Sequence, residues 1–144
     1  MEEQIECNNV SKILIKKFPD IITDDLFLDD DETLEYMVAS DFARYIIKNI
    51  DENNIEKLKE CFEFIELLHI NGTEKTKELA TIGYLEDLQN FTGGSKTMKK
   101  YKIIYDFIGI ESKKWWDKLN DFWNGIITHK TLMTKKNGVR QHRT

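Results

Sequence analysis

The sequence predicts an all-α protein of about six helices, arranged as an antiparallel array or an orthogonal bundle. The first observation behind this prediction is the scarcity of helix breakers, since 144 residues include one proline and seven glycines. The second is that apolar residues recur at spacings of three and four through most of the chain, as in helices with one buried face. Short polar turns between these segments favour antiparallel neighbours.

The first two predicted helices lie on either side of an acidic linker. One covers residues 3–18 and ends before Pro19, because the residue before a proline avoids the helical conformation. The other covers residues 31–50, with Asp31 as its N-cap and acids in its first turn, where the helix dipole favours negative charge. Residues 20–30 are expected to connect them.

Four more helices are expected. The third begins at residue 51 or 52 and ends at residue 70, and the others cover residues 74–91, 96–108 and 112–123. Gly72 is predicted to end the third helix in a left-handed conformation, Thr73 to cap the fourth and Ser112 the last. Gly83 lies inside the fourth helix, where glycine costs about 1 kcal/mol relative to alanine. A close helix crossing at Gly83 would explain its presence.

Charge divides the chain into two parts. Residues 125–144 contain five Lys or Arg and no acid, a charge of +5, which leaves 16 bases and 26 acids, or −10, in the rest. We therefore expect one helical domain over residues 1–124 and a basic, partly flexible tail over residues 125–144. An acidic body repels a phosphate backbone, so nucleic acid is a less favoured partner.

Targeting and redox signals are weak. The amino terminus lacks the basic and apolar segments of a secretory signal, and no apolar run approaches the roughly 20 residues that span a bilayer. We expect a cytoplasmic protein that does not enter membranes. Cys7 and Cys61 have no CxxC spacing and are expected to be reduced thiols.

No catalytic, cofactor-binding or metal-ligating residue is predicted. No Ser or Cys lies beside a plausible base, and the glycine-rich phosphate-binding patterns are absent from the sequence. His69 is expected at the end of a helix. Glu86 and Asp87 are adjacent, so their side chains should point in different directions, with one at the surface and the other bonding across a helix interface.

The acidic segment over residues 20–35 has six aspartates, two glutamates and no Lys or Arg. A calcium loop would require a glycine at its sixth position, which this segment lacks. A solvated helix entrance and a surface for a basic protein partner both remain open. The candidate partner-binding acids are Asp29, Asp30, Asp31, Glu32 and Glu35.

Three tryptophans lie within nine positions, at 115, 116 and 123. Adjacent helical residues cannot both face one interior, and we expect Trp116 to be the exposed member of its pair. An exposed aromatic side chain near an acidic surface is typical of an interface anchor. Trp116 is therefore the sixth candidate partner-binding residue.

Three stretches carry a family resemblance: ASDFARYIIKNI at 39–50, ELATIGYLEDLQN at 78–90 and FIGIESKKWWDKLNDFWNGIITHKTL at 107–132. They resemble a family of small bacterial domains that have no assigned enzymatic activity and are associated with toxin systems. The resemblance implies a protein-binding immunity protein that neutralises a toxin by stoichiometric occlusion of its active site, with a basic toxin domain as partner. The alternative is a small regulatory or nucleic-acid-associated protein that uses the basic tail.

Overall fold

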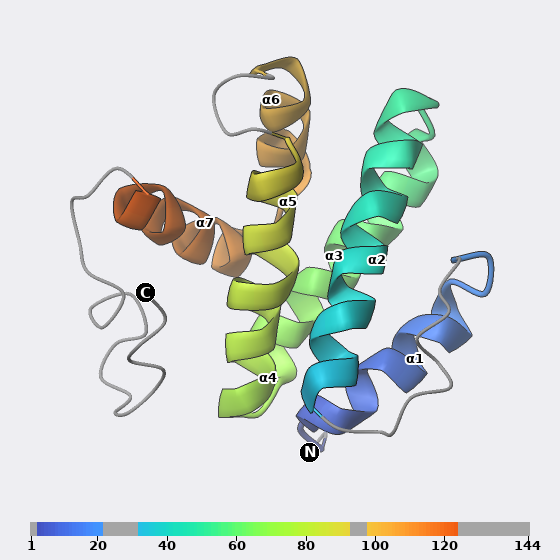
Figure 1. Cartoon of the computed structure of the whole chain (residues 1–144), viewed down its shortest axis with the longest axis vertical. Coiled ribbons are helices and arrows are strands. Elements are labelled where there is room, and N and C mark those ends of the chain that lie inside the picture. The colour runs from blue at the N-terminus through green and yellow to red at the C-terminus, as the bar shows by residue number, and fades with distance from the viewer. Residues whose placement is uncertain (1–2, 22–31, 93–97, 124–144) are drawn as a thin grey trace.

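The structure is a computed structural model that describes residues 3–21, 32–92 and 98–123. Within these ranges the chain is helical and contains no strand, which confirms the all-α prediction (Figure 1). A continuous helix that begins with α4 (Glu74–Glu78) and ends with α5 (Glu86–Phe91) runs through the centre of the molecule beside α2 (Glu32–Asp51) (Figure 1). Helix α7 (Ile110–Trp123) lies at a steep angle to this pair, on the side of α5 away from α2, and α1 (Val10–Lys17) lies at the other side of α2 (Figure 1).

The amino-terminal helix is shorter than predicted. A 3₁₀ turn, η1 (Cys7–Asn9), leads into α1 (Val10–Lys17), and residues 3–6 are not helical. The backbone of Ile5 instead pairs with the turn after α3: its N–H donates to the Asn71 carbonyl over 2.9 Å, and its carbonyl accepts from the Thr73 N–H over 3.1 Å. These bonds give the backbone of this segment the partners that a helix would otherwise supply.

Helices α2 (Glu32–Asp51) and α3 (Ile55–Asn71) form a hairpin. Asn53 adopts a left-handed conformation with φ of 56°, so the third helix begins later than predicted. Gly72 was expected to be left-handed and is instead extended, with φ of −90° and ψ of 159°. A Cβ atom at Gly72 would collide with the Leu68 carbonyl oxygen and the Thr76 side chain, so close packing is what requires glycine there.

The predicted helix over residues 74–91 is present as one continuous stretch of α4 (Glu74–Glu78), η3 (Leu79–Leu85) and α5 (Glu86–Phe91). The Thr73 hydroxyl caps it as expected, accepting from the Thr76 N–H over 3.3 Å. The middle segment, η3, is π-helical and wholly buried. A Cβ atom on Gly83 would lie 3.2 Å from Tyr36 Cδ1 and 3.3 Å from Ala39 Cβ, which confirms the close crossing with α2.

The last two described helices are α6 (Met98–Phe107) and α7 (Ile110–Trp123). Ser112 lies in the first turn of α7 instead of capping it, and the Glu66 carboxylate of α3 accepts from the Glu111 and Ser112 N–H groups, each over 2.9 Å. A side chain from a neighbouring helix thus satisfies the amino terminus of α7.

Five aromatic rings form the centre of the core, and Phe42 of α2 lies among them. Its ring centroid is 5.1 Å from that of Phe18, 5.9 Å from that of Phe64 and 5.8 Å from that of Tyr84. Tyr45 stacks on Phe42 at 5.9 Å. These contacts join the end of α1 with α2, α3 and η3, so one core fixes the position of η3 against α2.

Candidate functional site

A groove of about 350 Å³ opens between α2 and the helix formed by η3 and α5. The lining is mainly polar, whereas most small-molecule sites are mainly apolar, so the groove is better suited to a polar or charged group. The lining includes two acids and no Lys or Arg, and consists of Tyr36, Ser40, Ile82, Gly83, Glu86, Asp87 and Asn90.

Local sequence explains how the groove forms. Glycine at position 83 allows α2 and η3 to approach closely, with the Tyr36 ring beside it. A π-helical turn changes the angular spacing of side chains, and such turns occur frequently at functional sites. Here the π-helical segment ends directly before Glu86 and Asp87, and both residues line the groove.

Asp87 is the half-buried acid of the groove. The Ser40 hydroxyl donates to its Oδ2 atom over 2.7 Å, which confirms that one of the two adjacent acids bonds across a helix interface. Burial raises the pKa of Asp87, and the Ser40 hydrogen bond and the nearby Arg44 charge offset only part of that effect. The negative charge of the carboxylate is therefore less stabilised inside the protein than it would be in water.

The surface beside the groove is amphipathic. Arg44 donates to Asp41 Oδ1 over 3.3 Å, and its guanidinium carbon lies 5.0 Å from the centroid of the Phe91 ring. The Phe91 side chain is 40% exposed and Met37 of α2 is 38% exposed. Aromatic residues, methionine and arginine are enriched in protein interfaces, so this composition suits contact with another protein.

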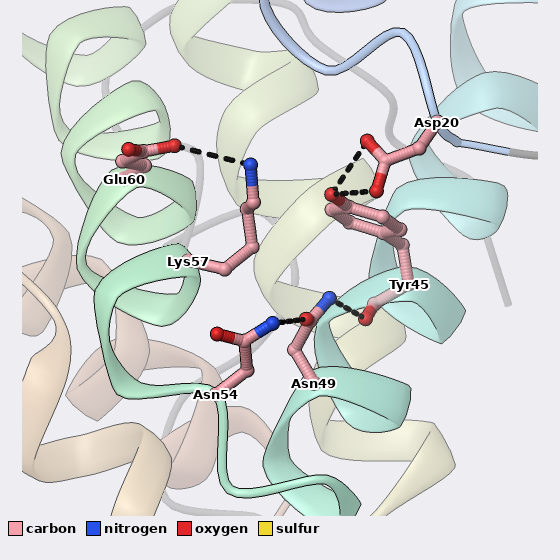
Figure 2. Close-up of polar contacts among 6 residues, drawn as sticks. All are labelled: Asp20, Tyr45, Asn49, Asn54, Lys57 and Glu60. Atoms are coloured by element: carbon pink, nitrogen blue, oxygen red, sulfur yellow. Dashed lines mark hydrogen bonds and ion pairs between the residues drawn. The ribbon is translucent and has the colours of Figure 1, made fainter.

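A second polar cluster joins α2 to the segment after α1 and to the turn before α3 (Figure 2). The Tyr45 hydroxyl points at Asp20 and donates to its carboxylate over 2.9 Å, and burial together with this bond raises the pKa of Tyr45. Asn49 accepts from the Asn54 side chain over 3.0 Å and donates to the Tyr45 carbonyl over 2.8 Å. These partners are supplied within the chain, so the cluster fastens the end of α1 to the hairpin.

His69 and Ser112 make a contact that resembles a nucleophile–base pair. His69 Nδ1 lies 2.9 Å from Ser112 Oγ, and His69 Nε2 lies 3.0 Å from Thr81 Oγ1. Ser112 donates its hydroxyl hydrogen to Glu66 over 2.8 Å, so the serine accepts from Nδ1–H and Nε2 accepts from Thr81. His69 and Ser112 are 4% and 1% exposed, and this network is a buried structural element.

The same network fixes the charge of His69. The residue lies in the last turn of α3, as predicted, but it does not carry the positive charge that the helix dipole favours. Burial lowers the pKa of His69 to about 4, even though Glu66 and Glu111 act in the opposite direction. The imidazole is neutral near pH 7 and serves as a hydrogen-bonding core residue.

Two predicted partner-binding residues are wrong. Glu35 is 0% exposed, and its carboxylate accepts from the N–H and the hydroxyl of Ser11, each over 2.8 Å, at the first turn of α1. Trp116 is also 0% exposed, and its indole N–H donates to the Tyr101 hydroxyl over 3.0 Å. Both side chains hold helices together and have no surface to offer a partner.

The other four candidates remain predictions. Asp29, Asp30 and Asp31 lie outside the described residues, and Glu32 is the first residue of α2. Among the described residues, no three His, Cys, Asp or Glu side chains form a group that could hold a metal ion. Over the same ranges, no helix has the length and apolar character needed to cross a bilayer.

Sequence reasoning did not identify the groove as a site. Its walls come from segments that lie more than 40 residues apart, such as Ser40 and Asp87, so no local pattern reveals it. The available signals were Gly83, because a glycine inside a helix indicates a close approach, and the adjacent acids Glu86 and Asp87.

Comparison with known proteins gives one match. No curated protein and no solved structure matches the chain. A family model matches residues 11–124, which include every described α-helix apart from the first residue of α1 and leave out the 3₁₀ turn η1. The chain therefore belongs to the family described as "Domain of unknown function (DUF7674)".

Proposed function

We propose that this protein is an immunity protein, which binds a bacterial toxin in a stoichiometric complex and covers its active site. The observation that carries the proposal is the acidic groove lined by Asp87, on helices that also expose the Met37 and Phe91 side chains. A charged group beside exposed apolar side chains provides both orientation and buried area in a protein complex.

The charge of the body supports the same proposal. Outside the basic tail the chain carries 16 bases and 26 acids, a charge of −10. A nuclease-like toxin has a basic active site, and opposite charges accelerate association with such a surface. Asp29, Asp30, Asp31 and Glu32 retain the steering role proposed from the sequence, while Phe91 replaces Trp116 as the aromatic anchor.

The proposal is tested by co-expressing the full chain with each protein encoded beside its gene. We expect one neighbour to inhibit growth when expressed alone, growth to return when the chain is present, and the purified pair to form a 1:1 complex. A second test measures the association rate at rising salt, where steering by exposed charge predicts a steep decrease. If none of the neighbouring proteins is toxic, or if the chain does not protect against the toxic one, the proposal fails.

The basic tail supports a second candidate, a regulatory or nucleic-acid-associated protein. Its five bases and lack of acids over residues 125–144 are the supporting observation. This candidate predicts that full-length protein binds DNA or RNA in a salt-dependent manner, and that replacing the five bases with glutamine abolishes binding. No retention of nucleic acid at low salt would exclude it.

A further inference from the structure

The groove between α2 and η3–α5 has the chemistry of a receptor for a basic side chain. Its acidic groups are Glu86 and Asp87, and no Lys or Arg is among its lining residues. Ser40 and Asn90 add neutral hydrogen-bonding groups on the two walls. A cation placed here would find charge and hydrogen-bond acceptors together.

The geometry of the walls favours a planar cation. Tyr36 is one of the lining residues, and its ring packs beside Gly83, where a Cβ atom would lie 3.2 Å from Tyr36 Cδ1, so an aromatic side chain contributes to one wall. Asp87 is held by Ser40 through Oδ2 on the same side of the bundle. A guanidinium group stacks on aromatic rings and donates several hydrogen bonds in one plane, whereas an ammonium group acts as a point charge.

We propose that this groove receives an arginine side chain of a protein partner, with Asp87 as the principal acceptor and Tyr36 as the stacking surface. The inference rests on the proposed function for the existence of such a partner. The exposed Met37 and Phe91 side chains on the same helices would offer apolar contacts to other residues of the partner. Burial raises the pKa of Asp87 by more than the Ser40 hydrogen bond and the Arg44 charge lower it, so a further positive charge in the groove would stabilise the carboxylate.

The first test uses the full chain and blocked amino acids as probes. In a ¹⁵N NMR titration, N-acetyl-arginine amide should shift the Ser40, Gly83, Asp87 and Asn90 amide signals saturably, with a millimolar dissociation constant. N-acetyl-citrulline amide has nearly the same shape without the charge, and we expect it to bind at least tenfold more weakly. Equal binding of the two probes, or no localised shift, would overturn the proposal.

Two variants sharpen the assignment. Asp87→Asn should weaken arginine binding at least fivefold, while Asp106→Asn, which removes one exposed acid from α6, should leave it unchanged. If the Asp87→Asn variant fails to fold, the arginine and citrulline comparison on the unaltered chain still decides the question. Equal effects of the two substitutions would show that general charge, and not the groove, attracts arginine.

A further control concerns the chain's own basic tail. Replacing Arg140 and Arg143 with glutamine should leave the groove signals of the free protein unchanged. A shift of those signals would assign the groove to the tail and overturn the proposed partner. Binding of blocked arginine without toxin neutralisation would retain the groove and reject the immunity function. If the protein neutralises a toxin, Asp87→Asn does not weaken that neutralisation and blocked arginine does not bind, the immunity function is retained and the arginine-binding groove is rejected.

Discussion

Glu66 and Asp87 are both half-buried acids that accept from a serine hydroxyl on a neighbouring helix, but their pKa values shift in opposite directions. Burial alone raises the pKa of Glu66, yet hydrogen bonds from the Glu111 and Ser112 backbones and the Ser112 hydroxyl outweigh it and lower the pKa. Asp87 has only the Ser40 hydroxyl and the more distant Arg44, so burial dominates and raises its pKa.

The opposite pKa shifts distinguish carboxylates that stabilise the fold from one that does not. The Glu66 carboxylate neutralises the amino terminus of α7, and Gly109 has no Cβ because that atom would collide with the Glu66 side chain. Glu35 has the same role at α1 through Ser11. Asp87 faces a groove without helix N–H groups, so its charge is available to a ligand.

The largest expected effect comes from breaking the most buried cap. Glu35→Ala should lower the free energy of unfolding by about 3 kcal/mol, because it leaves the Ser11 donors buried without their acceptor. Glu35→Gln keeps one acceptor oxygen and should cost less. Urea denaturation at pH 7 measures both. The interpretation of Glu35 as a cap is wrong if both variants unfold at the midpoint of the unaltered protein.

The next effect concerns His69, whose pKa of about 4 in the folded state lies below its usual value of 6.5. A base with a lowered pKa contributes stability that is complete above pH 6.5 and is lost as the pH falls toward 4. Within that pH window the free energy of unfolding should change by about 1.4 kcal/mol per pH unit. Glu66, Glu111 and Lys77 are the charged groups that face it.

His69→Gln should reduce that slope between pH 6.5 and 5, where most carboxylates have not yet titrated. Because the substitution also changes packing, the comparison uses the slope of unfolding free energy against pH and not its absolute value. An identical slope in the two proteins would mean that His69 becomes charged in the folded state without cost.

Glu66→Gln should lower the free energy of unfolding at pH 7 by about 1 kcal/mol, a smaller effect because solvent reaches part of this cap. Since the folded pKa of Glu66 is lowered, the carboxylate contributes stability at neutral pH and loses it as the pH falls through that pKa. The difference between the two proteins should therefore shrink in acid. Glu63→Gln, an exposed position on α3, is the matched control and should change stability by less than about 0.5 kcal/mol.

The sequence predicted the helices better than the polar contacts between them. Apolar spacing located α2, α3, α6 and α7 and the helix from 74 to 91, because that spacing directly reflects one buried face. Residues 3–6 were misassigned, since Ile5 pairs with Gly72 and no local pattern contains both positions. Glu66 likewise meets Ser112 from 46 positions away.

The sequence contains a pattern that indicates burial of Trp116 and Glu35, the two residues wrongly predicted to bind a partner. Ser112, Trp116 and Leu119 are all buried and follow the spacing of four and three that marks a core-facing stripe. The adjacency of Trp115 and Trp116 correctly implied different directions, but the stripe assigns the interior to Trp116. Glu35 similarly shares a stripe with Ala39 and Phe42, which indicated a buried acid.

The smallest stability effect is expected at Asp87, where the effect on binding is large. Asp87→Asn keeps an oxygen that can accept from Ser40 and removes a charge that burial disfavours, so the unfolding free energy at pH 7 should change by less than about 0.5 kcal/mol. The raised pKa means that the folded protein binds a proton before the unfolded chain does. The unaltered protein should therefore gain stability relative to Asp87→Asn as the pH falls through the folded pKa toward the lower pKa of the unfolded chain.

Urea denaturation at several pH values measures this difference, and the same samples serve for the arginine titration. A loss of several kcal/mol in Asp87→Asn would place Asp87 with Glu35 and Glu66 as a carboxylate that the fold requires. If Asp87→Asn is nearly as stable as the unaltered protein but no longer binds arginine, Asp87 differs from Glu35 and Glu66. A group that contributes little to folding but determines recognition belongs to a binding site.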